Sequence, residues 1–114
     1  MYFFDKTRRL LNKSDFDYVF AQSEKIVTST FILLHRKNSL EHARIGFALS
    51  KKIIAKACQR NRIKRLLRES FRTHTLPAVD IIILARHGVA KVDNKLITVN
   101  IGNAWDKLTA FYVN

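Results

Sequence analysis

The sequence predicts an α+β protein, a two-layer sandwich in which helices pack against a small sheet. Segments rich in β-branched and apolar residues alternate along the chain with segments whose apolar residues recur at helical spacing. The apolar fraction of 47% is typical of a folded globular protein, and 114 residues are enough to bury one core. We therefore expect residues 1–114 to form a single domain.

The first half of the chain is expected to contain one helix and two strands. The helix covers about residues 15–22 and begins at a sequence similar to a capping box, with Ser14 followed by Asp17. The first strand covers residues 26–35, which are rich in β-branched and apolar side chains, and the second covers residues 43–50.

The second half is expected to add a basic helix, a buried strand and a final helix. The basic helix covers about residues 56–73, and the apolar residues of 79–85 suit a strand that is buried on both faces. Asp93 or Asn94 is expected to begin the last helix, although Gly102 is a poor helix former. The apolar side chains that share one face of this helix are Ile97, Ile101, Ala104, Trp105 and Leu108.

The charge of the chain is strongly unbalanced. Lysine and arginine number 21 against 9 acidic residues, which gives a net charge of +12. Such an excess repels itself in the folded state, so a polyanionic partner is the natural explanation. Nucleic acid is the first expectation for this partner and an anionic membrane surface the second; the alternative to both is a soluble protein that happens to be basic.

The single cysteine and the distribution of apolar residues indicate the compartment. Cys58 excludes an internal disulfide and suits a reducing environment. The apolar run at residues 1–4 is too short for a secretory signal, and no apolar run approaches the roughly 20 residues of a membrane span. We expect a cytoplasmic protein without a membrane partner.

The predicted basic helix separates apolar and positively charged side chains. The apolar arc that is expected to pack on the sheet holds Ile63, Leu66, Leu67 and Phe71. On the opposite face the charges are positive, and Glu69 is the only acid between residues 57 and 72. Like charges at this spacing destabilise a helix, whereas a phosphate backbone neutralises them. An amphipathic helix with a solvated basic face is the alternative.

The residue types on this face suit RNA. Guanidinium groups match phosphate oxygens and stack on bases, and an asparagine amide can reach a sugar hydroxyl or a base edge. Lysines before the helix add positive charge near its N-terminal amides. The candidate RNA-binding residues are Lys51, Lys52, Lys56, Arg60, Asn61, Arg62, Lys64, Arg65, Arg68 and Arg72.

Two phenylalanines form a second candidate surface. Phe16 and Phe20 lie one helical turn apart. They are either core residues or, beside a basic surface, a platform on which unpaired bases stack.

These motifs together resemble the bacterial ribonuclease P protein family. The resemblance rests first on Arg60-Asn61-Arg62 and its continuation to Arg72, and it spans about residues 8–111. A lone Arg-Asn-Arg triplet is weak, but its whole context is specific. The other matching segments are Asp15-Phe16, Val19-Phe20, Arg44-Ile45-Gly46, Ser50-Lys51-Lys52 and residues 81–85.

The resemblance implies a fold similar to the second domain of ribosomal protein S5, with a left-handed βαβ crossover. It implies that the arginine-rich helix binds ribonuclease P RNA, with one protein per RNA. A cleft between the first helix and the sheet is then expected to hold the single-stranded 5′ leader of precursor tRNA. Phe16 and Phe20 match the aromatic residues of that cleft, and Leu34 stands where many members carry another aromatic. The loop at residues 54–56 lacks a glycine that is common in the family.

Chemistry by the protein itself is not expected, and we predict neither catalytic nor metal-binding residues. The histidines are scattered and form no metal-ligand spacing with Cys58. Asp80 has no acidic neighbour in sequence, although Asp15, Asp17 or Asp93 could approach it in space. The resemblance implies that the RNA holds Mg²⁺ and cleaves the precursor as an endoribonuclease, whereas the protein alone is inactive.

Three other functions stay open from the sequence. A ribosomal type of protein binds folded RNA without processing it. A DNA-binding regulator is disfavoured because no short helix precedes the basic one, as a helix-turn-helix requires. A membrane-surface helix is disfavoured because Trp105 lies outside the cationic segment.

Overall fold

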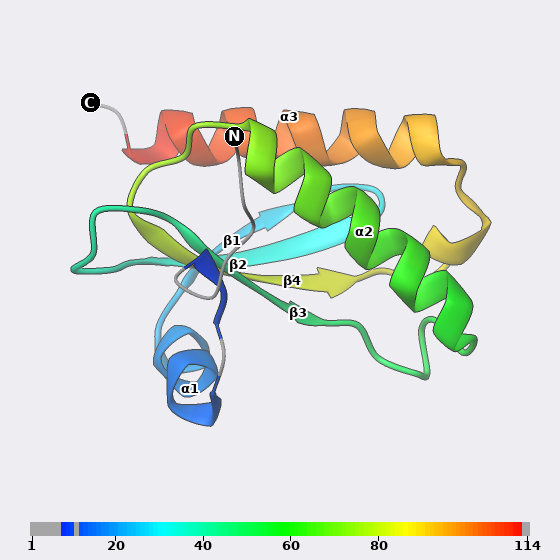
Figure 1. Cartoon of the computed structure of the whole chain (residues 1–114), viewed down its shortest axis with the longest axis horizontal. Coiled ribbons are helices and arrows are strands. Elements are labelled where there is room, and N and C mark those ends of the chain that lie inside the picture. Colours follow the sequence, from blue (N-terminus) through cyan, green and yellow to red (C-terminus); the bar gives the residue numbers. More distant parts are fainter. Residues whose placement is uncertain (1–7, 11, 113–114) are drawn as a thin grey trace.

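Helices and strands follow one another along the chain as Figure 1 shows. The computed structural model describes residues 8–10 and 12–112, and the apolar run at residues 1–4 lies outside that part. No helix of the described chain is long and apolar enough to cross a lipid bilayer. The elements in order are α1 (Lys13–Ala21), β1 (Glu24–Val27), β2 (Phe31–Lys37), β3 (Arg44–Ala48), α2 (Ala57–Thr73), β4 (Val79–Ala85), η2 (Val89–Lys91) and α3 (Asn94–Tyr112).

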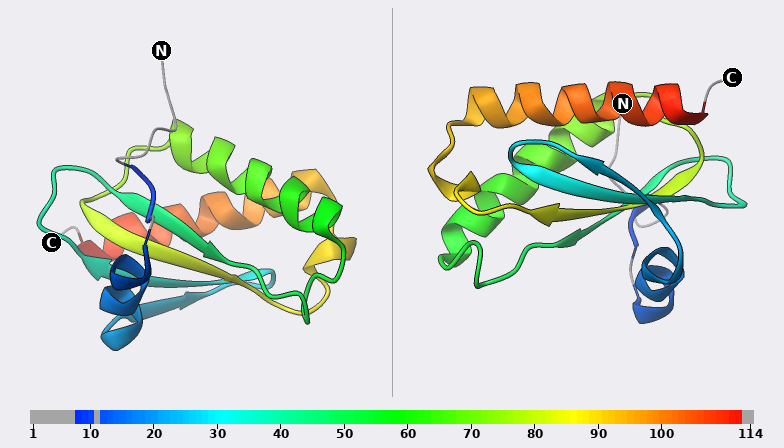
Figure 2. Two further views of the ribbon diagram at one scale, coloured as in Figure 1. Left: turned by 60° about the horizontal axis from the view of Figure 1, so that its bottom comes forward. Right: turned by 180° about the vertical axis from the view of Figure 1, so that it is seen from behind.

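The strands form one mixed sheet in the order β1-β2-β4-β3. β2 pairs antiparallel with both β1 and β4, whereas β3 lies parallel to β4. α2 connects the two parallel strands, and Figure 2 shows that this crossover is left-handed, opposite to the general rule. α2 and α3 lie on one side of the sheet and α1 lies on the other (Figure 1).

The prediction of one strand over residues 26–35 is wrong, because this segment is a hairpin. The Thr28 amide donates to the Phe31 carbonyl at 2.8 Å, and the Phe31 amide donates to Thr28 Oγ1 at 2.9 Å. A threonine hydroxyl that bonds the backbone in this way competes with sheet pairing and turns the chain. β1 and β2 therefore lie on either side of a polar turn.

The predicted start of α1 is also wrong. Asn12 caps this helix in place of Ser14, because the Asn12 side chain accepts a hydrogen bond from the Asp15 amide at 3.0 Å. Ser14 lies inside the helix and donates to Asn12 Oδ1 at 2.7 Å. The remaining predicted elements are confirmed with small shifts of their ends, and Asp93 accepts from the Leu96 amide at 2.8 Å at the start of α3.

The main core lies between the sheet and the pair of helices α2 and α3. Trp105 and Phe71 are buried there and meet edge to face, with ring centroids 6.0 Å apart. The Trp105 indole donates to Ser70 Oγ at 2.9 Å, so its polar group is satisfied. Burial of the apolar face of α3 explains why this segment is helical despite Gly102.

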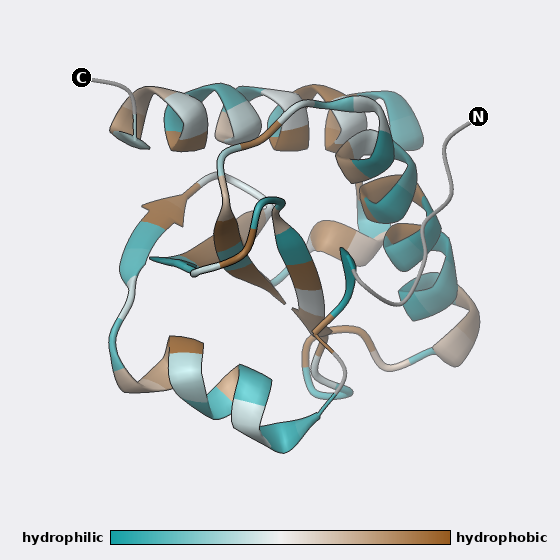
Figure 3. Ribbon diagram, turned by 60° about the vertical axis from the view of Figure 1, so that its left-hand side comes forward, coloured by the Kyte–Doolittle hydropathy of each residue, from teal (hydrophilic) through white to brown (hydrophobic). Residues whose placement is uncertain are grey.

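On its other side the sheet is only partly covered by α1. Val19 is the buried residue of this helix, and it packs in a small second core with Leu10 and Ile82. Leu34 and Leu84 line this side of the sheet and are only partly buried. Figure 3 shows mostly hydrophobic strands at the centre, with α1 standing below them. We call this side the open face of the sheet.

His35 is a buried polar residue at the end of the main core. It is 1% exposed, and its Nδ1 lies 2.7 Å from the Tyr112 hydroxyl. Its Nε2 is buried and meets no hydrogen-bond partner within the described chain. Burial lowers the pKa of His35 below 6.5, and the negative charge of Glu24 opposes this shift only in part.

We predict that the folded protein loses stability as the pH falls through about 6.5, where the unfolded chain begins to protonate His35 more readily than the folded protein. Above that pH the contribution of neutral His35 to the stability of the folded protein is complete. Urea unfolding at pH 7.5 and at about pH 5.5 measures the difference, and His35→Gln should reduce it. His87→Gln is the control because His87 is exposed. A pH dependence that is the same in His35→Gln and in the parent protein would contradict the prediction.

Candidate nucleic-acid interface

α2 turns the predicted basic face toward solvent. Lys51, Lys52 and Lys56 are exposed on the loop that leads into the helix, and Lys64 is half-buried along it. Arg72 donates to Glu69, and this hydrogen bond lowers the pKa of the Glu69 carboxyl. The residues that line a shallow depression of about 360 Å³ on this face are Asn61, Arg65, Arg68, Glu69 and Arg72. The depression thus brings together Asn61, Arg65, Arg68 and Arg72, which helical spacing places in one stripe opposite the apolar arc.

Arg60 holds the loop before α2. Its Nη1 donates to the carbonyl oxygens of Ile54 at 2.7 Å and Ala55 at 3.0 Å. The side chain of Ile54 is buried in the core, so the loop is held both by this side chain and by the hydrogen bonds from Arg60. The loop is built in this way without the glycine that the sequence lacks, and the sequence alone did not indicate this role of Arg60.

Arg62 joins α2 to the segment that precedes α3. Its guanidinium donates to the carbonyl oxygens of Ala90 at 3.0 Å and Val92 at 3.4 Å, and also to Asn94 Oδ1. Its Nε donates to Gln59 of the same helix at 2.8 Å. Arg62 is therefore a structural residue in the free protein, a role that its charge and spacing did not distinguish from RNA binding.

The N-terminal segment adds positive charge beside α2. The guanidinium of Arg68 lies over the Phe47 ring at 5.3 Å from its centroid, and that of Arg8 lies 4.8 Å from the centroid of Phe71. Burial lowers the pKa of Arg68, and the positive charge of nearby Arg9 lowers it further. Arg8 and Arg9 are not among the predicted RNA-binding residues, because only their charge distinguishes them and their segment is remote from α2 in sequence.

Phe16 and Phe20 lie together on α1 beside the open face of the sheet. Their rings stack at a centroid distance of 6.4 Å, and Phe20 is 50% exposed whereas Phe16 is half-buried. A glycine is required at position 46 for this arrangement, because a Cβ there would lie 2.6 Å from Phe16 Cζ. Leu34 packs in the same small cluster and is partly buried. We call Phe16, Phe20 and Leu34 the α1–sheet surface.

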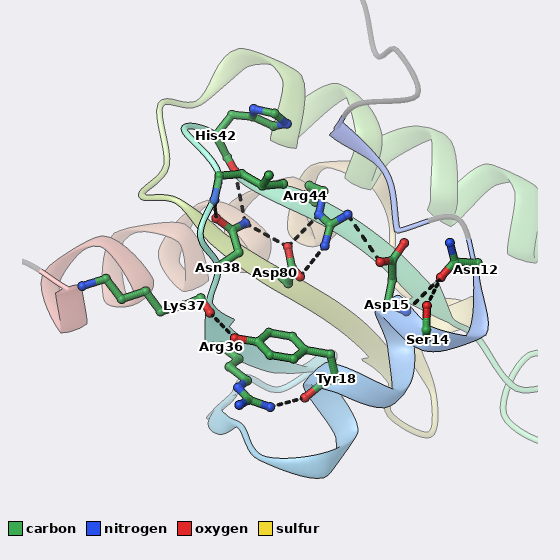
Figure 4. Close-up of polar contacts among 11 residues, drawn as sticks. Asn12, Ser14, Asp15, Tyr18, Arg36, Lys37, Asn38, His42, Arg44 and Asp80 are labelled. Atoms are coloured by element: carbon green, nitrogen blue, oxygen red, sulfur yellow. Dashed lines mark hydrogen bonds and ion pairs between the residues drawn. The ribbon is translucent and has the colours of Figure 1, made fainter.

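Arg44 of β3 pairs with a buried carboxylate of the sheet and with a partly exposed carboxylate of α1. Asp80 of β4 is fully buried and accepts hydrogen bonds from Arg44 Nε at 2.9 Å and Nη2 at 2.7 Å. Asn38 donates to the same carboxylate at 2.9 Å. The third nitrogen of the guanidinium, Nη1, lies 3.5 Å from Asp15 of α1. Figure 4 shows Arg44 between the two carboxylates.

The guanidinium of Arg44 engages both acidic residues at this surface. Asp15 approaches Asp80, as the sequence allowed, but the guanidinium of Arg44 lies between them. Hydrogen bonding to Asp80 raises the pKa of Arg44, so the positive charge stays in place. In the described residues no three histidine, cysteine or carboxylate side chains gather at metal-binding distance.

The other side of α1 is attached through Tyr18. The Tyr18 hydroxyl donates to the Lys37 carbonyl at 2.8 Å. Arg36 donates to the Tyr18 carbonyl at 2.6 Å, and its guanidinium lies 3.7 Å from the centroid of the Tyr18 ring. α1 is therefore tied to the sheet by polar contacts on two sides.

The fold thus carries a basic helix face and an aromatic surface. A family model described as Ribonuclease P matches residues 4–109 of the chain. The chain belongs to the ribonuclease P protein family. The ribonuclease P protein component of Legionella pneumophila (strain Lens) is 60% identical over 112 residues, which are 98% of each chain. That of Escherichia coli O157:H7 is 44% identical over 104 residues, 90% of this chain and 87% of the relative.

Solved structures show the same fold. The RNase P protein of Staphylococcus aureus is similar with a TM-score of 0.81 at 27% identity, covering 91% of this chain and 99% of that one. That of Thermotoga maritima gives 0.78 at 27% identity, covering 87% and 96%. The predicted family and fold class are thereby confirmed. The chain is a protein subunit of bacterial ribonuclease P. It therefore has a role in that holoenzyme and in tRNA processing, and it has an RNA partner.

We predict that Arg62→Ala lowers the free energy of unfolding by about 2 kcal/mol, because it leaves several carbonyl oxygens without their donor. Arg65→Ala removes the same charge from the exposed side of the same helix and should change stability by less than about 0.5 kcal/mol. Urea unfolding followed by circular dichroism measures both variants. Equal stability of the two would show that the contacts of Arg62 do not hold the junction.

Proposed function

We propose that this chain binds the catalytic RNA of ribonuclease P through α2 and the 5′ leader of precursor tRNA through the α1–sheet surface. The holoenzyme then removes the leader by endonucleolytic cleavage and leaves the mature 5′ end. The observation that supports this division best is the placement of two different surfaces on different sides of one sheet. α2 presents arginines, whereas α1 presents stacked phenylalanines beside an apolar sheet face.

The basic face of α2 suits a folded RNA backbone. Asn61, Arg65 and Arg68 are exposed along one stripe, and the lysines at 51, 52 and 56 continue it beyond the helix N-terminus. Each phosphate contact releases counterions and adds favourable free energy at low salt. Arg60 and Arg62 contribute mainly by holding α2 in place, since their donors already meet carbonyl oxygens of the protein. Arg72 ends the stripe at the C-terminal side of the helix, and Lys64 lies beside the stripe.

The α1–sheet surface suits a single strand. An aromatic ring offers a stacking face to any base, so such a surface is tolerant of sequence. Phe20 is exposed enough to stack directly, whereas Phe16 supports it and packs against the sheet at Gly46. Leu34 adds apolar contact without stacking.

We assign the cleavage chemistry to the RNA, with Mg²⁺ held mainly by the RNA and one protein bound per RNA. The carboxylate of Asp80 accepts hydrogen bonds from Arg44 and Asn38, which supports a structural role for Asp80. In this proposal the protein screens phosphate charge, engages the leader and acts in the cytoplasm.

The deciding experiment is processing of a precursor tRNA by bacterial ribonuclease P RNA at low Mg²⁺, with and without this protein. We predict cleavage at the mature 5′ end only when both are present, because the protein supplies charge screening that Mg²⁺ otherwise provides. The gain should be larger for a precursor with a long leader than for one with a single-nucleotide leader. Absence of stimulation by folded protein, with RNA that is active at high Mg²⁺, would contradict the proposed role of the protein in leader removal.

We predict that the double variant Arg65→Ala/Arg68→Ala weakens binding to ribonuclease P RNA and flattens its salt dependence. The slope of log affinity against log salt should fall by up to about 0.9 for each lost phosphate contact. Lys25→Ala/Lys107→Ala removes the same charge from β1 and α3 and is the control. The same reduction in both double variants would mean that only net charge matters, and the α2 face would lose its assignment.

A further inference from the structure

The attachment of α1 to the sheet is a distinct feature of this fold. α1 carries both phenylalanines of the α1–sheet surface, yet Val19 is its one buried residue among those described. Phe20 and Tyr18 are exposed to 50% and 40%. A helix with so little buried apolar area has little hydrophobic free energy to fix its position. Its distance from the sheet must therefore depend largely on polar contacts.

The polar contact nearest to the phenylalanines begins at Asp80. This carboxylate is buried, and it holds two nitrogens of Arg44 at 2.9 and 2.7 Å. Two hydrogen bonds from one guanidinium to one carboxylate fix the plane of the guanidinium, which one bond alone does not do. The position of Arg44 is thus set by the sheet and not by α1.

The remaining side of Arg44 is directed at α1. Its Nη1 lies 3.5 Å from Asp15 Oδ1, and the two side chains are only 20% and 22% exposed. Screening by water is reduced at such a site relative to a surface ion pair. Asp15 directly precedes Phe16, and Arg44 lies two residues before Gly46 on β3. The ion pair and the Phe16–Gly46 contact therefore join the same two short segments, as Figure 4 shows for the ion pair.

We infer that Arg44 is a positioning residue for leader binding, because through Asp15 it sets the distance of Phe16 and Phe20 from the open face of the sheet. The inference rests on the proposed function of the α1–sheet surface. Without the charge on Asp15, α1 stays attached through Tyr18, Arg36 and Lys37 but can turn away from the sheet. The protein remains folded, and the spacing of its aromatic surface is no longer fixed.

The test compares Asp15→Asn with Asp17→Asn in the reconstituted holoenzyme. Both variants remove one negative charge from α1, but Asp17 is 57% exposed and pairs with Lys13 of the same helix at 2.8 Å. Asp15→Asn should raise KM about threefold to fivefold for a precursor with a long leader, the effect of one partly shielded ion pair. It should leave KM for a single-nucleotide leader, kcat and affinity for the RNA unchanged. Asp17→Asn should change none of these.

A second comparison separates positioning from direct contact. Asp15→Asn is repeated in a Phe20→Ala protein, in which the exposed aromatic ring is absent. If Asp15 acts by positioning the aromatic surface, its substitution has little further effect there, so the two changes are not additive. Additive effects, or an equal loss for long and short leaders, would overturn the positioning role.

The outcomes also distinguish this inference from the function on which it rests. If Phe20→Ala reduces the advantage of a long leader and Asp15→Asn does not, the α1–sheet surface binds the leader and the inference about Arg44 fails. If Phe20→Ala keeps the full advantage of the long leader, the assignment of the leader to this surface fails as well. Leu96→Ala, at a 49% exposed apolar residue of α3, controls for loss of surface hydrophobicity.

Discussion

Burial of the apolar side of α2 against the sheet is the constraint from which the rest of the interface follows. Ile63, Leu67 and Phe71 are fully buried, so the rotation of the helix about its axis is fixed. Once these side chains face the sheet, Arg65 and Arg68 must face solvent. The hydrophobic core thus orders a row of positive charges that repel one another and that an isolated helix would hold poorly.

Contacts within the free protein reduce the repulsion between the positive charges of α2. Arg60 and Arg62 donate to backbone carbonyl oxygens, where partial negative charge is available. Arg68 lies over the ring of Phe47, whose face attracts a cation. Arginines of one helix therefore divide into those that stabilise the fold and those that remain directed outward, although all carry the same charge.

The two sides of the sheet differ in how strongly their helices are held. Large buried residues such as Trp105 fix α2 and α3, whereas α1 depends on Asp15, Tyr18 and a small apolar cluster. Rigid packing keeps the spacing of the charges on α2 constant, which suits the folded RNA that we propose as the partner of this face. On the other side, the ion pair between Arg44 and Asp15 supplies part of the attachment that buried apolar area does not supply for α1.

The sequence by itself determined the fold class, the family and the basic face, because each depends on residue patterns along the chain that do not require knowing how the segments pack. Helical periodicity places Ile63 opposite Arg65 whatever the surroundings, and burial on both faces explains the apolar run at residues 81–83. Only the tertiary structure decided the turn at Thr28, the structural roles of Arg60 and Arg62, and the ion pairs of Arg44. These depend on which backbone carbonyl or carboxylate lies within hydrogen-bond distance of a side chain. Arg44 and Asp80 are 36 residues apart in sequence, so no local pattern can reveal their contact.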